Sequence, residues 1–567
     1  MAESWNRQIG CRLRRAAGAV KMARMTEVSP KSLEKPAGGA KSYLGRLVVL
    51  LAAISVARVL YVALSGLALS GDEAQYWDWS RRLEWCYFSK GPMVAWLIWL
   101  GRAALGDTAL GVRLPAIILS AGTSLMLYDL GRRLYDARTG FAAALLMQIT
   151  PIFAAFGVGM SIDPPYLFFW VAALLLLYRA VADHSRFCWL LLGLALGLGL
   201  LSKYTIGLFY PCAFGWLLFG RQRRGWLKTP WPYLAVAISL AFLLPLLQWN
   251  AQNGWVNFQH NIGHAHHQKE WQLTPLKTLV YVGSQLGVVT PVLLVMMLVA
   301  QWQLRGRDSF SPWFCLPVLG FFLLISLQTD VYANWPLTAY VTGCIVFAAR
   351  FLGDRTGQST HLRRTVNFAV ILALVCTLAV MVVVVVPLPF LPSKPPHVNV
   401  AGRDFTISFL CEKKDPSHLF AGWDQLGKRV ADLEGELGPR RFVIGSERMT
   451  TSRLAYYIPG QPQVYHYRSP KGEIDSQYHV WKGYEDLLGY DALFVTYRNG
   501  DNPVVLPKDV QASFASAEET EFVSRDLLGR PITTYHIWLC RDYRGPAATA
   551  AAQAGGGDSA GSGPPSP

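Results

Sequence analysis

Two adjacent carboxylates, Asp72 and Glu73, open the stretch GDEAQYWDWSRRLEWCYFSKGPMVAW at the edge of a long apolar run. A carboxylate beside hydrocarbon is costly unless it is hydrogen-bonded, paired or functional. One interpretation is structural, because an acidic residue after a glycine caps a helix start. The other is catalytic, because a carboxylate close to water can take the proton of a hydroxyl group. The sequence leaves both interpretations open.

Three cationic side chains are predicted to lie near the same membrane face as this acidic pair. They are Lys90 in YFSKGPM, Lys203 in GLLSKYTIG and Arg113, near the outer end of its apolar segment. A single lysine in such a place is explained by snorkelling of its ammonium group to the interface. Together, however, the three could converge on an anion at membrane depth, and the phosphate of a lipid-linked substrate is such an anion.

Asp163, in GMSIDPPYLFF, precedes two prolines that open the next apolar segment. It fits either a helix start or a second carboxylate at the level of Asp72. Farther along, WNAQNGWVNFQHNIGHAHHQKEW carries His260, His264 and His267. These histidines would share one helical face and could ligate a divalent metal, although histidines also serve as interface or pH-sensitive groups. A divalent metal is therefore the one candidate cofactor, and its presence stays open.

The composition is that of a membrane protein. The chain has 567 residues, of which 52% are hydrophobic and 16% charged, and its mean hydropathy is +0.25. Apolar stretches of roughly 17 to 25 residues can each cross a bilayer as a helix. We predict a polytopic α-helical protein with about eleven transmembrane helices. They lie near residues 43–69, 109–131, 139–158, 164–183, 187–201, 204–220, 230–249, 275–302, 311–328, 335–351 and 365–392.

The distribution of Lys and Arg sets the predicted orientation, because cytoplasmic loops retain positive charge. Basic residues crowd the segment before the first span and every second loop after it, whereas Lys269 is the only one in 250–274. We therefore predict a cytoplasmic N-terminus and place residues 71–108, and everything after 392, outside. Much of the formal net charge of +16 is this topology signal, so no nucleic-acid partner is expected.

The chain divides by composition into four parts. Residues 1–41 are predicted to be a disordered, basic, cytoplasmic N-terminus, and 546–567 a disordered low-complexity tail. Residues 42–392 form the membrane body. In 397–541, short apolar runs such as RFVIGS and DALFVTY alternate with helical stretches, which predicts a small α/β domain. No phosphate-binding glycine loop occurs there, so we interpret it as a lid or an acceptor-binding accessory.

The first outer loop is predicted to contain two helices that do not span. Residues 73–85 place aromatic side chains among charges, as a helix lying in the membrane interface does. Pro92 begins a second apolar piece, 92–105, which is too short to span and is expected to lie at the surface.

Five motifs occur in register with this topology: GDEAQYW, YFSKGPMVAWLI, GVRLPA, SIDPPYLFF and GLALGLGLLSKYTIGL. They resemble the bacterial members of the dolichyl-phosphate-mannose protein mannosyltransferase superfamily, near the lipid A aminoarabinose transferase branch. The resemblance implies a GT-C fold and a glycosyltransferase that works with inversion. The donor would be a polyprenyl-phosphate sugar in the surrounding membrane lipids. The acceptor would be lipid A, another glycolipid, a glycan or a protein, at the periplasmic face of the bacterial inner membrane.

The resemblance also implies roles for the acidic residues. Asp72 matches the base that takes the acceptor hydroxyl proton, Glu73 is its motif neighbour, and Asp163 matches the acidic residue of the second outer loop. Two positions depart from the aminoarabinose transferases. Gln75 stands where they carry an arginine and Ser89 where they carry a glutamate, so the metal requirement and the identity of the donor sugar stay open.

The cations acquire roles in the same way. Tyr87 and Lys90 match the aromatic–lysine element that holds the donor phosphate, and Lys203 matches the lysine after the small-residue helix. With Arg113 they form the predicted phosphate-binding set. A lipid phosphate is already a good leaving group, so these cations need only stabilise its developing negative charge.

Two other classes of protein compete with this hypothesis. A non-enzymatic transporter or flippase of lipid-linked sugars would show internal repeats and mid-span charges. Here no repeat is evident, and the charges cluster at one face. A structural or assembly protein of the membrane would tolerate Asp72→Asn and Lys90→Ala.

Overall fold

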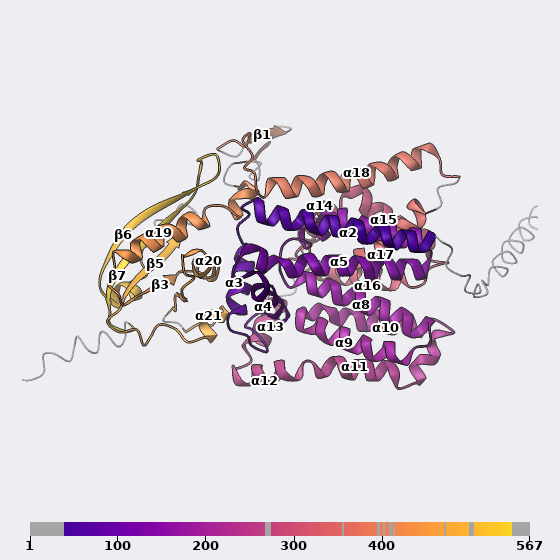
Figure 1. Ribbon diagram of the computed structural model, residues 1–567, viewed down its shortest axis with the longest axis horizontal. Coiled ribbons are helices and arrows are strands. Elements are labelled where there is room, and N and C mark those ends of the chain that lie inside the picture. The colour runs from indigo at the N-terminus through magenta and orange to yellow at the C-terminus, as the bar shows by residue number, and fades with distance from the viewer. Residues whose placement is uncertain are drawn as a thin grey trace, which may run out of the picture. The chain divides into compact units, whose positions relative to one another are not determined.

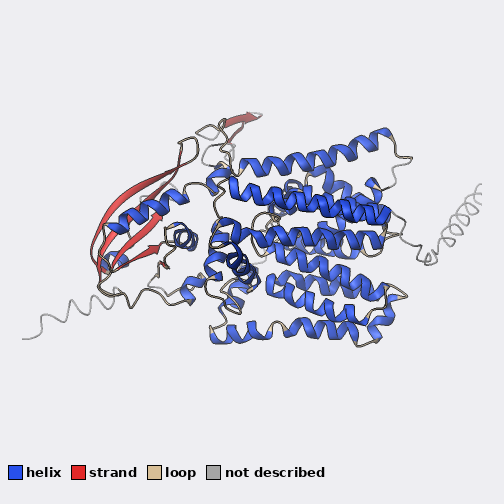
Figure 2. Ribbon diagram, in the orientation of Figure 1, coloured by secondary structure: helices blue, strands red, loops and turns tan. Residues whose placement is uncertain are grey.

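The structure is a computed structural model that describes residues 39–266, 274–353, 357–393, 397–400, 403–406, 411, 414–469, 472–497 and 504–546 (Figures 1 and 2). The chain divides into two units, Met1–Arg46 and Leu47–Pro567. Of the first, only the start of helix α2 (Gly39–Leu64) is described. The two tails predicted to be disordered lie outside the described residues, except for 39–41 and Pro546. Apart from the start of α2, the features below belong to the second unit.

Apolar helices make up most of the described chain before residue 393. Five helical stretches are long and apolar enough to cross a membrane: α2 over Ser42–Leu64, α5 (Ala109–Leu134), α8 (Asp163–Ala182), Trp231–Gln252 and α18 (Thr360–Val383). A bent pair raises this to six, and further apolar helices are shorter. The protein is thus a multi-pass membrane protein, and the total of eleven spans stays a prediction.

The shorter helices lie between and beside these spans. They are α4 (Met93–Leu105), α6 (Ala137–Ile149), α7 (Pro151–Ala155), α9 (Arg186–Ser202), α10 (Phe209–Leu218), α13 (Val256–His266), α16 (Ser311–Ser326) and α17 (Ala339–Phe347). Helices α11 (Trp231–Ala241) and α12 (Leu244–Gln252) together form the long stretch Trp231–Gln252. Helix α4 coincides with the piece predicted at 92–105.

The apolar stretch 275–302, predicted as one span, is a bent pair of helices. Helices α14 (Pro275–Val289) and α15 (Pro291–Leu304) meet at 97°. Thr290 forms the corner with a φ of +79°, and Pro291 disfavours helical geometry at the residue before it. The hydropathy pattern missed this bend because both arms are apolar.

Helix α3 (Gly71–Ser80) begins with a capping box built by Ser70 and Glu73. The Ser70 hydroxyl accepts a hydrogen bond from the Glu73 amide at 3.2 Å, and the Glu73 carboxylate accepts one from the Ser70 amide at 2.9 Å. This reciprocal pair satisfies two amide donors that a helix start leaves open. The N-cap predicted at Asp72 is therefore wrong, because Ser70 is the N-cap residue and Glu73 completes the capping box.

The aromatic side chains of the first outer loop are buried in protein. The prediction was a single helix over 73–85 that lies in the membrane interface. Helix α3 already ends at Ser80, and Trp77 and Trp79 are fully buried. Trp77 contacts Tyr456 edge to face at 5.0 Å, and Trp79 stacks on Tyr87 at 4.4 Å. The prediction was wrong in extent and setting because aromatic residues among charges fit a protein interface as well as a membrane interface.

The C-terminal module is of the predicted α/β type. Its sheet has the strand order β4-β3-β5-β7-β6, with β3 parallel to β4 and β5, and β7 antiparallel to β5 and β6. The strands are β3 (Arg441–Gly445), β4 (Val464–His466), β5 (Asp491–Tyr497), β6 (Phe514–Arg525) and β7 (Pro531–Tyr543), drawn in red in Figure 2. The other elements after residue 393 are β1 (His397–Val400), β2 (Arg403–Thr406), α19 (Trp423–Gly435), α20 (Arg448–Tyr457), α21 (Gln477–Val480) and α22 (Lys508–Ala512).

Helix α20 packs against α3. One hydrophobic cluster contains Trp77 of α3 and Val94 of α4 together with Leu426 and Leu454 of the module. Because these residues share a core, the module holds the first outer loop and the candidate site next to it.

Candidate active site

Glu73 and Arg113 form a buried ion pair, called the anchor pair below. The Arg113 guanidinium donates to both carboxylate oxygens of Glu73 at 2.8 Å, and the two side chains are 5% and 1% exposed. Arg113 also donates to the carbonyls of Leu67 and Ala68 at 2.8 and 2.7 Å. The Met160 amide donates to Glu73 at 3.0 Å.

Both members of the anchor pair are directed at protein groups. Burial raises the pKa of Glu73, but the charge and hydrogen bonds of Arg113 outweigh it, so the pKa lies below its usual value. A carboxylate held ionised in a bidentate pair is a poor base, and a guanidinium directed at protein oxygens does not face a phosphate. The catalytic role of Glu73 and the phosphate-binding role of Arg113 stay predictions, and these contacts favour a positioning role for both side chains.

Asp72 lies on the other side of α3 and has a different environment. Its side chain is 51% exposed and pairs with Arg448 of α20 at 3.2 Å. Arg448 also donates to Gln75, one turn along the same helix. An exposed carboxylate held by one exposed cation stays accessible to a hydroxyl group.

Asp163 and Lys203 form a second ion pair, at 2.8 Å, with side chains 5% and 10% exposed. Asp163 begins α8, and Lys203 follows the last residue of α9. The second Asp163 oxygen accepts a hydrogen bond from Asn334 at 2.9 Å. The Lys203 ammonium lies 5.4 Å above the Tyr166 ring. Asp163 thus fixes the position of the Lys203 charge.

Lys90 lies among all of these charges. The charges of Lys203, Asp72, Asp163 and Arg448 all act on its ammonium group. Burial, with Lys203 as the next cause, lowers the pKa of Lys90. We call these five residues the site cluster. Its three cations exceed its two carboxylates, so it is suited to an anion.

Tyr87 holds the loop that carries Lys90 through hydrogen bonds. It is fully buried, and its hydroxyl donates to the backbone of the first outer loop at Trp79 or Arg82. Its backbone amide donates to the Lys90 carbonyl at 3.1 Å, and its carbonyl accepts from Asn257 at 2.7 Å. The contact of Tyr87 with phosphate stays a prediction, and these hydrogen bonds favour a role for Tyr87 in positioning the Lys90 loop.

The histidine-rich loop is only partly within the described structure. The His260 ring packs against Phe88 with ring centres 4.5 Å apart. The His264 side chain and the whole of His267 lie outside the described residues. The metal site predicted at these histidines therefore stays a prediction.

Two residues of the site were not found from the sequence. Arg448 is 376 positions from Asp72 along the chain, and no local pattern marks it as a partner. Asn334 carried a weak signal, since a polar side chain at the edge of an apolar run invites a functional explanation.

Comparison with known proteins decides the family. Residues 89–249 match the family model described as dolichyl-phosphate-mannose-protein mannosyltransferase. The lipid A galacturonosyltransferase RgtD of Rhizobium johnstonii is 32% identical over 334 residues, which cover 57% of this chain and 68% of that protein. The chain belongs to the dolichyl-phosphate-mannose-protein mannosyltransferase superfamily. It is a membrane glycosyltransferase, which confirms the prediction of an enzyme over a transporter or an assembly protein.

Other relatives of this glycosyltransferase support the same family and its fold. The undecaprenyl phosphate-alpha-4-amino-4-deoxy-L-arabinose arabinosyl transferase of Pseudomonas aeruginosa is 35% identical over 170 residues, 29% of this chain and 30% of that protein. The crystal structure of ArnT from Cupriavidus metallidurans bound to undecaprenyl phosphate superposes with a TM-score of 0.56 at 14% identity. The superposition covers 87% of this chain and 97% of the ArnT chain, so the two proteins share the GT-C fold.

Proposed function

We propose that this glycosyltransferase moves a sugar, with inversion, from a polyprenyl-phosphate donor to a hydroxyl group of lipid A at the periplasmic face of the inner membrane. The observation that carries this proposal is the site cluster, which sets an exposed carboxylate beside three cations. The names of the Rhizobium and Pseudomonas relatives support the lipid acceptor and the undecaprenyl-phosphate donor.

Asp72 acts as the base in this mechanism. Its carboxylate takes the proton of the acceptor hydroxyl while the hydroxyl oxygen attacks the anomeric carbon of the donor. The bond from that carbon to the phosphate oxygen breaks, and its electron pair leaves with the phosphate. One displacement from the opposite face inverts the anomeric configuration.

Lys90 and Lys203 stabilise the phosphate that leaves. A lysine binds phosphate as a point charge, and charge that develops in a partly buried site is stabilised more strongly than in water. Lys90 has no ion-pair partner among the described residues and is therefore available to the donor. Lys203 is already paired with Asp163, so it contributes its field from a fixed position.

Arg448 favours an acidic donor sugar. The excess positive charge of the site cluster repels an amino sugar and attracts a carboxylate, which an arginine binds in bidentate fashion. Arg448 also stands beside Gln75, where the resembled aminoarabinose transferases carry an arginine of their own. The Rhizobium relative is named a galacturonosyltransferase, and we infer that this enzyme also transfers a uronic acid.

The test is transfer by the purified enzyme in liposomes. Lipid A is supplied with undecaprenyl-phosphate galacturonic acid or with the aminoarabinose donor, and the product is followed by mass spectrometry. We expect lipid A to gain the mass of one uronic acid, with the anomeric configuration opposite to that of the donor by NMR. Transfer of aminoarabinose alone would refute the donor assignment. Donor movement across the bilayer without any product would refute the reaction.

A further inference from the structure

Three side chains of the C-terminal module direct their ligand atoms at one another. They are His466 at the end of β4, Asp475 in the loop that follows, and His479 in α21. One carboxylate oxygen of Asp475 lies 3.5 Å from His466 Nε2 and 3.0 Å from His479 Nδ1. The two imidazole rings stack with centres 4.7 Å apart, and all three ligand atoms lie within 4.8 Å of one another.

The far nitrogen of each ring is directed at a backbone carbonyl. His466 Nδ1 lies 3.2 Å from the Gly445 oxygen, and His479 Nε2 lies 3.0 Å from the Tyr467 oxygen. A carbonyl oxygen only accepts, so these nitrogens carry the ring protons. The Asp475 amide donates to His479 Nδ1 at 3.3 Å, in agreement with that tautomer.

The near nitrogens then present lone pairs to a carboxylate. Electron-rich atoms this close repel one another unless a proton or a metal cation lies between them. Histidines that bind metals have this arrangement, in which the distal N–H is held by a carbonyl and the other nitrogen is left to the ion.

The spacing and chemistry of the donors fit a zinc-like ion. In a tetrahedral zinc site with bonds of about 2.0 to 2.2 Å, two ligand atoms lie about 3.4 Å apart. The distances from the Asp475 oxygen to His466 Nε2 and His479 Nδ1 are close to this value. We propose that His466, Asp475 and His479 bind one divalent transition-metal ion, with a fourth position open to water. The Asp475 side chain is 67% exposed, so an ion can enter from solvent. This site is separate from the histidines at 260–267.

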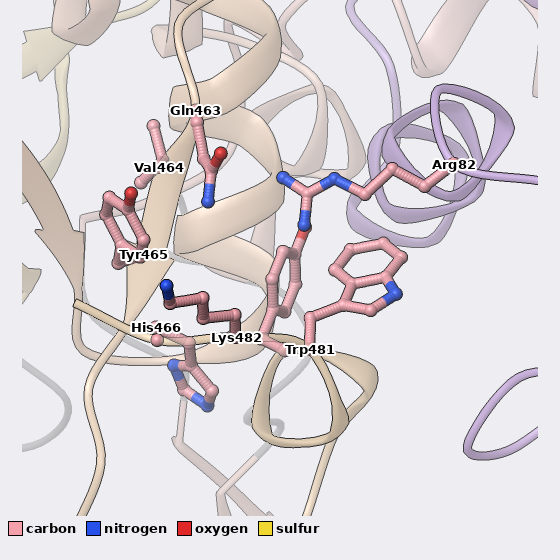
Figure 3. Close-up of a pocket in the computed structure, with 9 residues that line it drawn as sticks. Arg82, Gln463, Val464, Tyr465, His466, Trp481 and Lys482 are labelled. Atoms are coloured by element: carbon pink, nitrogen blue, oxygen red, sulfur yellow. The ribbon is translucent and has the colours of Figure 1, made fainter. Parts of the chain in front are cut away.

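The same segment also holds the loop that carries Lys90. The Gln477 side chain accepts a hydrogen bond from the Phe88 amide at 2.6 Å, two residues before Lys90. Trp481 donates to Glu84, and the Arg82 guanidinium lies 4.4 Å above the Trp481 ring. Figure 3 shows His466 and Trp481 lining one hollow, into which Arg82 reaches from the first outer loop. A metal that fixes Asp475 and His479 therefore steadies the backbone next to Lys90.

The test measures metal on the full-length protein in detergent, stripped with a chelator, reloaded with Zn²⁺ and desalted. We expect the wild type to retain about one more ion per chain than Asp475→Asn or His479→Gln. Each variant should also bind Zn²⁺ more than about 100-fold more weakly than the wild type. Cobalt loading should give tetrahedral absorption bands in the wild type that both variants lack.

His418→Gln is the matched control, because His418 is a histidine of the same module that pairs with a single carboxylate, Asp526, at 3.3 Å. It should retain the wild-type metal content. Equal metal content and affinity in the wild type, Asp475→Asn and His479→Gln would overturn the proposal, and so would an equal loss in His418→Gln. Metal content is read without substrate, so this result is independent of whether the sugar-transfer assay succeeds.

Discussion

The anchor pair and the site cluster each contain one of two neighbouring carboxylates, Glu73 and Asp72, and these two side chains differ in burial and in the number of their partners. Glu73 is buried, and both of its oxygens accept hydrogen bonds from Arg113 and backbone amides. Asp72 is half exposed and holds one partner, Arg448. Successive residues of a helix point about 100° apart, so one carboxylate enters the protein and the other faces the site. A carboxylate whose oxygens are all hydrogen-bonded to protein stabilises the fold. A half-exposed carboxylate can still accept a proton from a substrate.

The largest expected effect is on catalysis by Asp72→Asn. The amide cannot accept the hydroxyl proton, so we expect kcat to fall by about 10² to 10⁴. The thermal unfolding temperature should not change, because the side chain is half exposed and its ion pair is weak. Steady-state transfer assays and a thermal melt in detergent measure the two quantities. Wild-type turnover by this variant would remove the distinction between the two carboxylates.

Glu73→Gln should have the converse effect. It leaves the buried Arg113 charge uncompensated, which costs about 3 to 5 kcal/mol of folding free energy. The Glu73→Gln/Arg113→Gln double variant should be more stable than the single variant, because the orphan charge is gone. Melting temperatures of the three proteins give the comparison. If Glu73→Gln melted like the wild type, Glu73 would not anchor the loop.

Lys90→Ala tests the cationic side of the site cluster. Removing a charge aimed at the leaving phosphate should lower kcat/KM for the donor by about 100-fold, and Lys90→Arg should retain part of it. Lys482→Ala, at a lysine 79% exposed on the C-terminal module, is the matched control and should be unaffected. Equal kinetics in the two alanine variants would exclude Lys90 from phosphate binding.

The pH dependence of donor binding is a smaller effect. Because burial and Lys203 lower the pKa of Lys90, its charge is lost at a pH below the ordinary lysine value of about 10.4. Donor KM should therefore rise, by about tenfold, as pH increases towards that value. Lys90→Arg should abolish the rise, since arginine stays charged. A rise that persists in Lys90→Arg would assign it to another group.

Arg448→Ala should have the smallest effect, measured on the reaction of a neutral donor. Exposed ion pairs contribute at most about 1 kcal/mol, so kcat should change by no more than about fivefold. Lys428→Ala, at an exposed position of α19, is the control. The preference for an acidic over a neutral donor should fall only in Arg448→Ala. Unchanged preference would limit Arg448 to pairing with Asp72.

The sequence by itself determined the class of protein and much of the site. Hydropathy indicated a multi-pass membrane protein, and the order of five motifs indicated the family. Four of the predicted residues, Asp72, Lys90, Asp163 and Lys203, lie together in the structure. These signals are local, because hydropathy and short motifs depend only on residues near one another along the chain.

Only the tertiary structure decided which charged side chains face the site and which are paired with other protein groups. Arg113 and Tyr87 are predicted phosphate ligands, and in the structure their side chains bind backbone carbonyls and, for Arg113, the Glu73 carboxylate. Arg448 meets Asp72 because the C-terminal module packs on α3. His466, Asp475 and His479 meet because the fold of that module brings β4, the loop after it and α21 together. Sequence spacing does not show such meetings, because helix rotation and long-range packing decide which side chains share one space.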